Sequence, residues 1–507
     1  MEEKHHISNN DKPDEFIIRK DKLQKLNSQK ILPYRFDRTH TTEDIIKNFE
    51  QLSASKTIVK IAGRIITIRE HGKTKFAHLQ DQSGKIQIYF RQDFLGESFE
   101  HLNLVDIGDI LGVEGEVFKT KTNEITVLVK SYEILNKSLH PMPEKWHGLK
   151  DIEIKYRHRY LDLIANPESK KLIILRTQIL RLLRQFFDSR GFIEVETPIL
   201  QPIYGGASAR PFETYYNALG QKMFMRISDE LYLKRLIIGG LEKVYEIGKD
   251  FRNEGLDRFH NPEFTQLEAY EAYKDYNDMM FLVEELFRFL CTNLFQTTTI
   301  TYSIREAIPE KPNEFKYRNV TLDFGRPWQR IEFCSALKAK TGIDVLTAEP
   351  KELRQVAVEN GVIEKEVAPI MTQTKLLDKL FSALVQKDLI DPTFVIDYPK
   401  ITTPLARNHR NNPLLVERFE PIICGIEIGN AFSELNDPIE QRARFEEQLA
   451  RQEEYATLDE DFIRALEYGM PPTAGLGLGI DRIVMLLTNS DSIREVIPFP
   501  QLKRIED

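Results

Sequence analysis

The stretch from residue 245 to residue 270 constrains the fold more than any other, because it reads as two extended segments joined by a charged loop. Residues two apart on a strand point to one face, which places Arg252 and Glu254 together on the first segment. One face of the second segment carries Phe264, Gln266, Glu268 and Tyr270. If the segments pair as a hairpin, a cation, an aromatic ring and two acids share one surface. A core-facing strand would not carry that set, so the hairpin predicts a functional site.

The length of 507 residues predicts two or three domains, and 41% hydrophobic and 29% charged residues are typical of a soluble globular protein. Three widely spaced cysteines indicate neither a disulfide framework nor a zinc site. No apolar run approaches 18 residues and no signal peptide opens the chain. We therefore expect a cytoplasmic protein with no membrane partner.

Charge is divided unevenly along the chain. Residues 1–150 contain 24 Lys and Arg against 22 Asp and Glu, a net charge of +2, whereas the whole chain carries −8. The N-terminal part is therefore the more plausible docking region for a polyanion, although chance variation explains so small a difference equally well.

Residues 1–56 read as a polar tail followed by a basic amphipathic helix at about 14–28. Residues 57–140 hold about five short β-rich runs separated by turn signals, which fits a small barrel of the OB type. Such barrels bind single-stranded nucleic acid or sugars. Phe76 and His78 alternate on one strand near Arg69, a combination suited to unpaired bases. An all-β module with an exposed aromatic side chain is also common without that function.

Residues 141–165, with two prolines, are the expected linker, and residues 166–507 the second domain. A long helix is predicted at about 169–189, because its apolar residues recur at helical spacing and an Arg-Gly pair ends it. Residues 327–390 read as a mostly helical insertion, and strand-like character returns after it.

Three segments stand out in order: 190–198 after the long helix, FRNE at 251–254, and GLGLGIDR at 475–482. Together they resemble motifs 1, 2 and 3 of the class II aminoacyl-tRNA synthetases. The segments GGASARPF, DELYLKRL, FRNEG, RHRYLDLI, GIEIGNAFSELND and PPTAGLGLGIDR resemble the lysyl-tRNA synthetases of that class, over about residues 15–505. The resemblance implies an α+β chain, with an OB-fold anticodon-binding barrel, a catalytic antiparallel sheet flanked by helices, and a homodimer built partly through motif 1.

The implied reaction joins the carboxylate of L-lysine to the α-phosphate of ATP and then transfers the lysyl group to the 3′ end of tRNA(Lys). The substrate carboxylate is already a nucleophile, so the reaction needs positioning and charge neutralisation rather than an enzyme base. An arginine fork suits phosphate and carboxylate oxygens. By resemblance, Arg252 and Arg482 are the catalytic residues.

The resemblance also assigns the nucleotide contacts. Arg252 would bind the α-phosphate, Glu254 the adenine edge and His260 the phosphate tail. Phe264 and Arg482 would stack on the two faces of adenine. Glycines at 475, 477 and 479, with Gly479 at the nucleotide, would leave room for that close approach.

In this family the phosphates are met by Mg²⁺, which prefers carboxylate oxygens. Glu420 and Glu427 match the family's metal ligands. On an unbroken strand, however, Glu427 would point to the face opposite Asn430. A bulge or bend near Gly429 would resolve that conflict.

Specificity for lysine requires an anion for its ε-ammonium group, because a buried unpaired charge is costly. By resemblance, Glu434 and Tyr270 hold the ε-amino group, and Glu230 and the Gly206 backbone hold the α-amino group. The remaining expected lysine contacts are Glu268, Asn430 and Phe432. In the barrel, the positions that match the family's contacts to a U-rich anticodon are Arg69, Phe76, Gln87 and Glu124.

Three alternatives remain at this point. A ligase that lysylates elongation factor P resembles the second domain but lacks the barrel. Aspartyl and asparaginyl synthetases share the architecture, but Glu434 and its flanks favour a cationic substrate. A non-catalytic, RNA-binding paralogue should have lost Arg252, Arg482 or the acids, and all are present.

Overall fold

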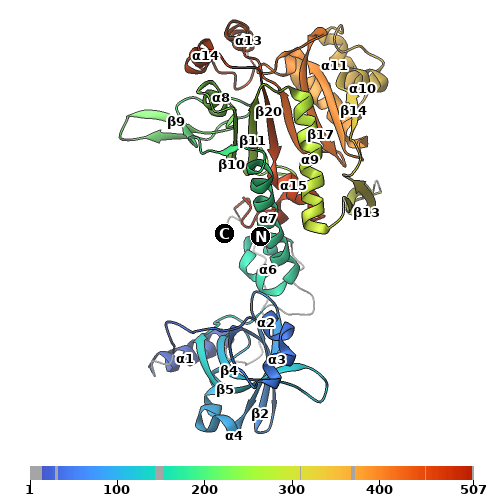
Figure 1. The fold of residues 1–507 in the computed structure, drawn as a ribbon. Helices are drawn as coiled ribbons and strands as arrows, with labels where there is room; N and C mark the ends of the chain where they lie inside the picture. Colours follow the sequence, from blue (N-terminus) through green and yellow to red (C-terminus); the bar gives the residue numbers. More distant parts are fainter. Residues whose placement is uncertain are drawn as a thin grey trace. The chain divides into compact units, whose positions relative to one another are not determined.

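The computed structural model describes residues 14–28, 32–142, 152–308, 310–366, 371–451 and 453–504. The expected polar tail at 1–13 and residues 143–151, near the start of the expected linker, lie outside these ranges. The chain divides into two compact units, residues 1–150 and 151–507, each considered by itself (Figure 1).

The first unit is a closed five-stranded barrel with strand order β1-β2-β3-β5-β4. Its strands are β1 (Ile58–His71), β2 (Thr74–Gln80), β3 (Lys85–Arg91), β4 (Ile110–Lys119) and β5 (Ile125–Asn136). Its helices are α1 (Glu15–Ser28), α2 (Thr42–Lys47), α3 (Phe49–Ala54), α4 (Gln92–Leu95) and the 3-10 helix η1 (Gly96–Leu104). Alternation sorts the side chains: Ile86, Ile88 and Phe90 of β3 are buried in the barrel, whereas Gln87 and Tyr89 face outward.

The second unit is organised around a ten-stranded sheet whose main path is β14-β15-β17-β19-β20-β11-β10-β6, with β16 and β18 paired to β17. Its strands are β6 (Ile193–Glu194), β10 (Lys243–Phe251), β11 (Glu263–Ala272), β14 (Gln329–Glu332), β15 (Thr393–Pro399), β16 (Asn408–His409), β17 (Asn412–Ile423), β18 (Ile426–Glu427), β19 (Gly429–Ser433) and β20 (Thr473–Gly479). Neighbours are antiparallel except β14 with β15 and β10 with β6. Two small sheets accompany it: β7 (Leu200–Gln201), β9 (Gln221–Met225) and β8 (Glu213–Tyr216), and the hairpin β12 (Thr299–Ile308) and β13 (Lys311–Asp323).

This unit also contains helices, several of which pack on the two faces of the sheet. They are α5 (Ile152–Arg157), α6 (Arg159–Ala165), α7 (Pro167–Asp188), α8 (Glu230–Ile238), α9 (Tyr276–Phe295), α10 (Phe333–Thr341), α11 (Pro350–Glu359), α12 (Gln373–Leu384), α13 (Pro438–Ala450), α14 (Glu460–Glu467), α15 (Ile480–Leu487) and α16 (Ile493–Val496), with 3-10 turns η3 (Gln386–Asp388) and η4 (Lys400–Thr402). α7, α9 and α15 share one core with the sheet, whereas α8, α10, α12 and α14 share a second (Figure 1).

Side chains alternate between the two faces of the sheet along β11, and this alternation determines which face carries the site. Leu267 and Ala269 belong to the core beneath α7 and α9. Gln266, Glu268 and Tyr270 therefore point to the opposite face.

Two expectations need correction. The first hairpin segment is shorter than predicted: β10 ends at Phe251, so Arg252 and Glu254 lie in the loop rather than on a strand face. The range 327–390 is not wholly a helical insertion either, since its start forms β14, an edge strand of the main sheet. Helices α10, α11 and α12 follow it. None of the helices in the described ranges is long and apolar enough to cross a membrane.

Candidate active site

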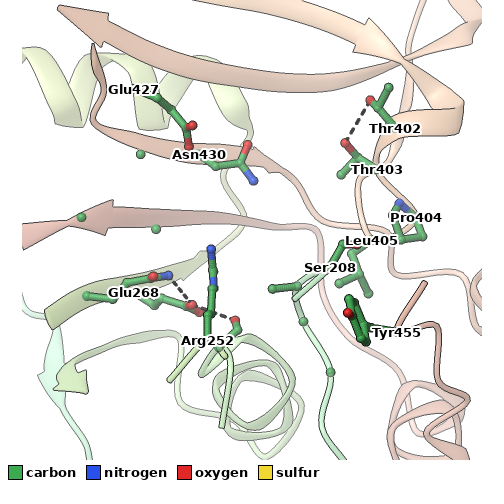
Figure 2. Close-up of a pocket in the computed structure, with 18 of the residues that line it drawn as sticks. Ser208, Arg252, Glu268, Thr402, Thr403, Pro404, Leu405, Glu427, Asn430 and Tyr455 are labelled. Carbon is green, nitrogen blue, oxygen red and sulfur yellow. Dashed lines mark hydrogen bonds between the residues drawn. The ribbon is translucent and has the colours of Figure 1, made fainter. Parts of the chain in front are cut away.

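A cavity of about 570 Å³ opens on the polar face of β11 (Figure 2). Strand β20 forms its floor. Its glycines at 475 and 477 pair with Tyr270 and Glu268 on one side and with Phe432 and Asn430 on the other. Because glycine has no side chain, the floor stays open while the side chains of β11 and β19 rise on either side. Leu476 and Leu478, the alternate residues, are buried in the core below.

Gly475 is required by close packing. A Cβ built there would lie 2.5 Å from Tyr270 Cε1 and closer still to Glu434 Oε1. At Gly479 the nearest atom to such a Cβ is Ile428 O, at 3.5 Å, an ordinary contact. Gly475 therefore makes room for Glu434 and Tyr270 at the acidic end of the cavity, whereas the space around Gly479 is more open.

Arg252 is positioned by the backbone around it. Its amide donates to Pro262 O (2.8 Å), and Nε and Nη2 donate to Ile227 O (3.4 Å each). The guanidinium carbon lies 5.1 Å from the Phe264 ring centroid. In Figure 2, Arg252 and Glu268 lie on one side of the cavity, with Glu427 and Asn430 on the other.

Arg482 and His260, 222 residues apart, meet at the cavity. Arg482 Nη2 lies 3.0 Å from His260 Nε2, and His260 Nδ1 lies 2.7 Å from Asp257 Oδ2. Arginine only donates, so Nε2 accepts and the imidazole proton sits on Nδ1, donated to Asp257. Arg482 Nη1 also donates to Glu427 O (2.7 Å). All six expected ATP-binding residues line this cavity: Arg252, Glu254, His260, Phe264, Gly479 and Arg482.

The other end of the cavity is acidic. Glu268 accepts side-chain hydrogen bonds from Ser228 Oγ (2.8 Å), Gln266 Nε2 (2.7 Å) and Tyr270 Oη (3.1 Å). Burial, reinforced by the charges of Asp250 and Glu230, raises the pKa of Glu268 to about 8, against the lowering effect of these donors.

Most expected lysine contacts line the cavity: Gly206, Glu268, Tyr270, Asn430, Phe432 and Glu434. Glu230 does not, although a Cβ built at Gly206 would lie 3.2 Å from Glu230 Cβ. Its carboxylate instead meets Lys234 Nζ at 2.5 Å, and Lys234 Nζ also contacts Glu434 Oε2. Sequence reasoning missed Lys234, although its spacing of four residues from Glu230 on a helix was the available signal.

A register shift brings one of the two expected metal ligands, Glu427, to the cavity. Phe419 pairs with Ala431, but Ile422 pairs with Glu427, so one extra residue is absorbed around Ile428. Glu427 therefore lines the same cavity as Asn430, which resolves the conflict in parity. Glu420 is not in the cavity lining and pairs with Arg418 Nη2 at 2.5 Å.

These carboxylates fit a Mg²⁺ ion. Burial raises the pKa of Glu420 to about 7, Arg418 lowers it, and the charge of Glu427 raises it further. A divalent cation would relieve that repulsion. Among the described residues, His, Cys, Asp and Glu form no cluster of three that could hold a metal. Two carboxylates suffice for Mg²⁺, which keeps waters and takes substrate phosphates as ligands.

Arg418 is a second residue that sequence reasoning missed. Its Nε donates to Asn430 Oδ1 (2.8 Å) and Nη1 to Thr403 Oγ1 (2.5 Å). Because the amide oxygen is occupied, Asn430 turns its NH₂ group toward the cavity (Figure 2). The signal available was strand alternation, which puts Arg418 on the face of Glu420.

The expected anticodon contacts gather on one outer face of the barrel in the first unit. Arg69 pairs with Phe76, and Phe76 with Tyr89, whose ring stacks on it at 4.2 Å between centroids. Gln87 Nε2 donates to Glu124 Oε2 (2.8 Å). Tyr89, which sequence reasoning missed, was detectable from its alternation with Gln87.

Comparisons with known proteins agree with this geometry. The family model "tRNA synthetases class II (D, K and N)" matches residues 151–503, and the model "OB-fold nucleic acid binding domain" matches residues 59–135. The fold is that of a class II tRNA synthetase with an OB-fold anticodon-binding domain. The chain is 51% identical to the lysine–tRNA ligase of Carboxydothermus hydrogenoformans, over 96% of this chain and 97% of that protein. It is 52% identical to that of Aquifex aeolicus (91% and 76% covered) and 50% identical to that of Thermosipho melanesiensis (96% and 95%). The chain belongs to the lysine–tRNA ligase family.

Proposed function

We propose that this cavity activates L-lysine with ATP and transfers the lysyl group to the 3′ end of tRNA(Lys). The observation that carries the proposal is the polarity of a single cavity. Arg252, Arg482 and His260 line one part of it, and buried carboxylates, with Glu434 innermost, form the other. That arrangement matches a substrate with a carboxylate at one end and an ammonium group at the other, adjacent to a triphosphate.

In the first step, a carboxylate oxygen of lysine attacks the α-phosphorus of ATP. The new C–O–P linkage is lysyl-adenylate, and the P–O bond to pyrophosphate breaks. Arg252 binds both the lysine carboxylate and an α-phosphate oxygen, which holds the reactants together and offsets the charge that develops on phosphate. The Asn430 amide orients the carboxylate.

The adenine part of ATP is held by stacking and hydrogen bonding. Phe264 and Arg482 take its two faces, and Glu254 accepts a hydrogen bond from its amino group. Gly479 lets the ring approach the floor, and His260, which donates its Nδ1 proton to Asp257, lies beside the phosphate tail. In the second step, a hydroxyl of the terminal tRNA ribose attacks the lysyl carbonyl and AMP leaves.

Glu420 and Glu427 would hold Mg²⁺, which supplies charge neutralisation at the phosphates when bound. The lysine side chain extends to Glu434 and Tyr270, with Glu268 and Phe432 beside it. Glu230 and the Gly206 backbone receive the α-ammonium group. Glu434 Oε1 supports this assignment, because it is buried without a hydrogen bond from any described residue.

The barrel face centred on Phe76 would read the anticodon. An unpaired base stacks on Phe76, and Arg69 contributes its positive charge. Gln87 and Glu124 give up the hydrogen bond between them and instead form hydrogen bonds with the edges of the bases. The proposed domain limits are 57–140 for this domain, 141–165 for the linker and 166–507 for the catalytic domain. Three unpaired cysteines fit a cytoplasmic location, where ATP and tRNA are available.

A homodimer would cover an apolar surface near β6, at the end of the main sheet. The exposed residues there are Ile193, Ile199, Leu200, Ile203, Tyr215, Tyr216 and Leu219. Exposed side chains of this kind, gathered on neighbouring short strands, indicate a protein interface. Sedimentation should give twice the chain mass of 59.1 kDa. A monomer at micromolar concentration would refute the dimer.

The decisive experiment is ATP–pyrophosphate exchange with each of the twenty amino acids. Lysine alone should support rapid exchange, and purified tRNA(Lys) should then accept the lysyl group. Exchange with aspartate or asparagine would overturn the proposal. Lysylation of elongation factor P and RNA binding without catalysis find no support, since the barrel is present and the arginines and acids line one cavity.

A further inference from the structure

Lys234 lies behind the acidic end of the proposed lysine pocket. It does not line the cavity itself but pairs with Glu434, which does. Its side chain is fully buried on α8. The ammonium group pairs with Glu230 (2.5 Å) and with Glu434, and lies 5.4 Å from the Phe432 ring centroid and 5.9 Å from that of Phe462. A fully buried lysine is rare, and here it bridges two residues that are themselves expected to bind the substrate.

The charges in this region add up in a simple way. The carboxylates at the acidic end are Glu230, Glu268 and Glu434. If all are ionised, Lys234 reduces their charge from −3 to −2. The two ammonium groups of a bound lysine bring +2, so the filled site is neutral. The substrate carboxylate is left to Arg252, outside this group.

We propose that Lys234 is a positioning residue that sets the charge of the lysine pocket. It pairs with Glu230 and Glu434 before lysine arrives, which favours their ionised forms, and it cancels one of the three negative charges, so that the remaining two match the two ammonium groups of the substrate. This inference rests on the proposed function, and it adds a residue that contacts the substrate's partners rather than the substrate.

The geometry of Glu434 supports this role. One of its oxygens, Oε2, contacts Lys234, and the other, Oε1, is buried with no hydrogen bond from the described residues. Lys234 therefore fixes the carboxylate in place and leaves one oxygen for an incoming ammonium group. Buried unpaired charge is costly, so a ligand that supplies that ammonium is strongly favoured.

The Lys234 ammonium group lies beside Glu230 of α8, Phe432 of β19, Glu434 just after that strand and Phe462 of α14, and the charge of Glu268 on β11 acts on Glu434. Burial raises the pKa values of Glu230 and Glu434, and Lys234 is the largest influence that lowers them. Lys234 therefore opposes the protonation that burial favours at both carboxyl groups.

The test measures the pH dependence of lysine binding in the full-length enzyme. In the wild type, Glu268, with its pKa of about 8, should already make KM for lysine in ATP–pyrophosphate exchange fall by up to about tenfold per pH unit between pH 6.5 and 8. In Lys234→Met a second carboxyl group binds a proton that lysine must displace. KM should therefore be at least about tenfold above the wild type at pH 6.5 and fall more steeply with pH, by about a further tenfold per unit until that carboxyl group ionises.

Three comparisons test whether the lost charge of Lys234 causes the change in KM for lysine. KM for ATP should stay within about twofold in Lys234→Met, because the nucleotide end is separate. Lys234→Arg keeps the charge and should restore the wild-type pH profile, even if the larger guanidinium changes KM itself. Lys338→Met, at an exposed lysine on α10 that pairs with Asp344, should match the wild type throughout.

A second measurement counts the protons released when lysine binds, by calorimetry at pH 7 in two buffers with different ionisation enthalpies. Glu268, with its pKa of about 8, should account for up to one proton in the wild type. Lys234→Met, or Lys234→Gln where the Met variant fails to fold, should release about one proton more than the wild type. Equal proton release, or equal pH profiles, for the wild type and the folded variant overturns the inference. Failure of the wild type to exchange with lysine would instead overturn the proposed function.

Discussion

Replacing Gly475 with alanine tests whether packing on the cavity floor controls lysine binding. The added methyl group would overlap Glu434 Oε1 and lie 2.5 Å from Tyr270 Cε1. Both side chains are buried, so neither can move without leaving its place in the pocket. Overpacking of this kind costs about 1–3 kcal/mol in stability.

The larger effect should be on lysine affinity. Displacing the Glu434 carboxylate weakens a buried charge pair with the ε-ammonium group, which is worth about 2–5 kcal/mol when one partner is lost. We expect loss of about 2–3 kcal/mol, since the carboxylate is moved rather than removed. That corresponds to a rise in KM for lysine of about 30- to 150-fold.

The assay is ATP–pyrophosphate exchange at varied lysine and varied ATP, with Gly479→Ala on the same strand as the comparison. A methyl group there meets its nearest atom at 3.5 Å, so KM for lysine should not change. Any effect of Gly479→Ala should fall on KM for ATP. If Gly475→Ala leaves KM for lysine within threefold of the wild type while the protein remains folded, the reasoning is wrong.

Three further changes test other parts of the molecule. Arg252→Ala should reduce exchange by at least about a hundredfold without unfolding the protein, because it removes the group that joins carboxylate and α-phosphate; normal exchange would remove that role. Phe76→Ala should spare exchange and weaken tRNA charging by about 1–3 kcal/mol, since it deletes the stacking surface next to Tyr89; equal loss in both assays would argue against the barrel's role. Burial opposes ionisation of Glu440, but neighbours that include Arg444 hold its pKa at about 2. Its stabilising effect is therefore present above the ordinary carboxyl range and lost as pH falls through about 2, so Glu440→Gln should lower the melting temperature at pH 7 more than at pH 3.

Much of the site could be predicted because the relevant patterns are local. Alternation on β11 places Gln266, Glu268 and Tyr270 on one face whatever the rest of the chain does. The alternation of glycine along residues 475–479 likewise predicts a strand surface that neighbouring side chains can approach closely. The segments 251–254 and 475–482 carry the family resemblance, and the comparisons confirm the family.

Other features were beyond sequence reasoning because they depend on contacts between distant segments. The face taken by Glu427 was undecided until the register shift around Ile428 was known. The proton position on His260 follows only from its contact with Arg482. Arg252 was placed on a strand, but β10 ends one residue earlier, where the hairpin loop begins.

The sequence by itself determined the kinds of groups available and their alternation, because residue type and the two-residue period of a strand are fixed along the chain. Only the tertiary structure decided how those groups share charge. Lys234 reads in sequence as one more cation on a helix, yet folding buries it between Glu230 and Glu434. Electrostatic pairing depends on distance and burial, and both are set when helix, strands and glycine floor pack together.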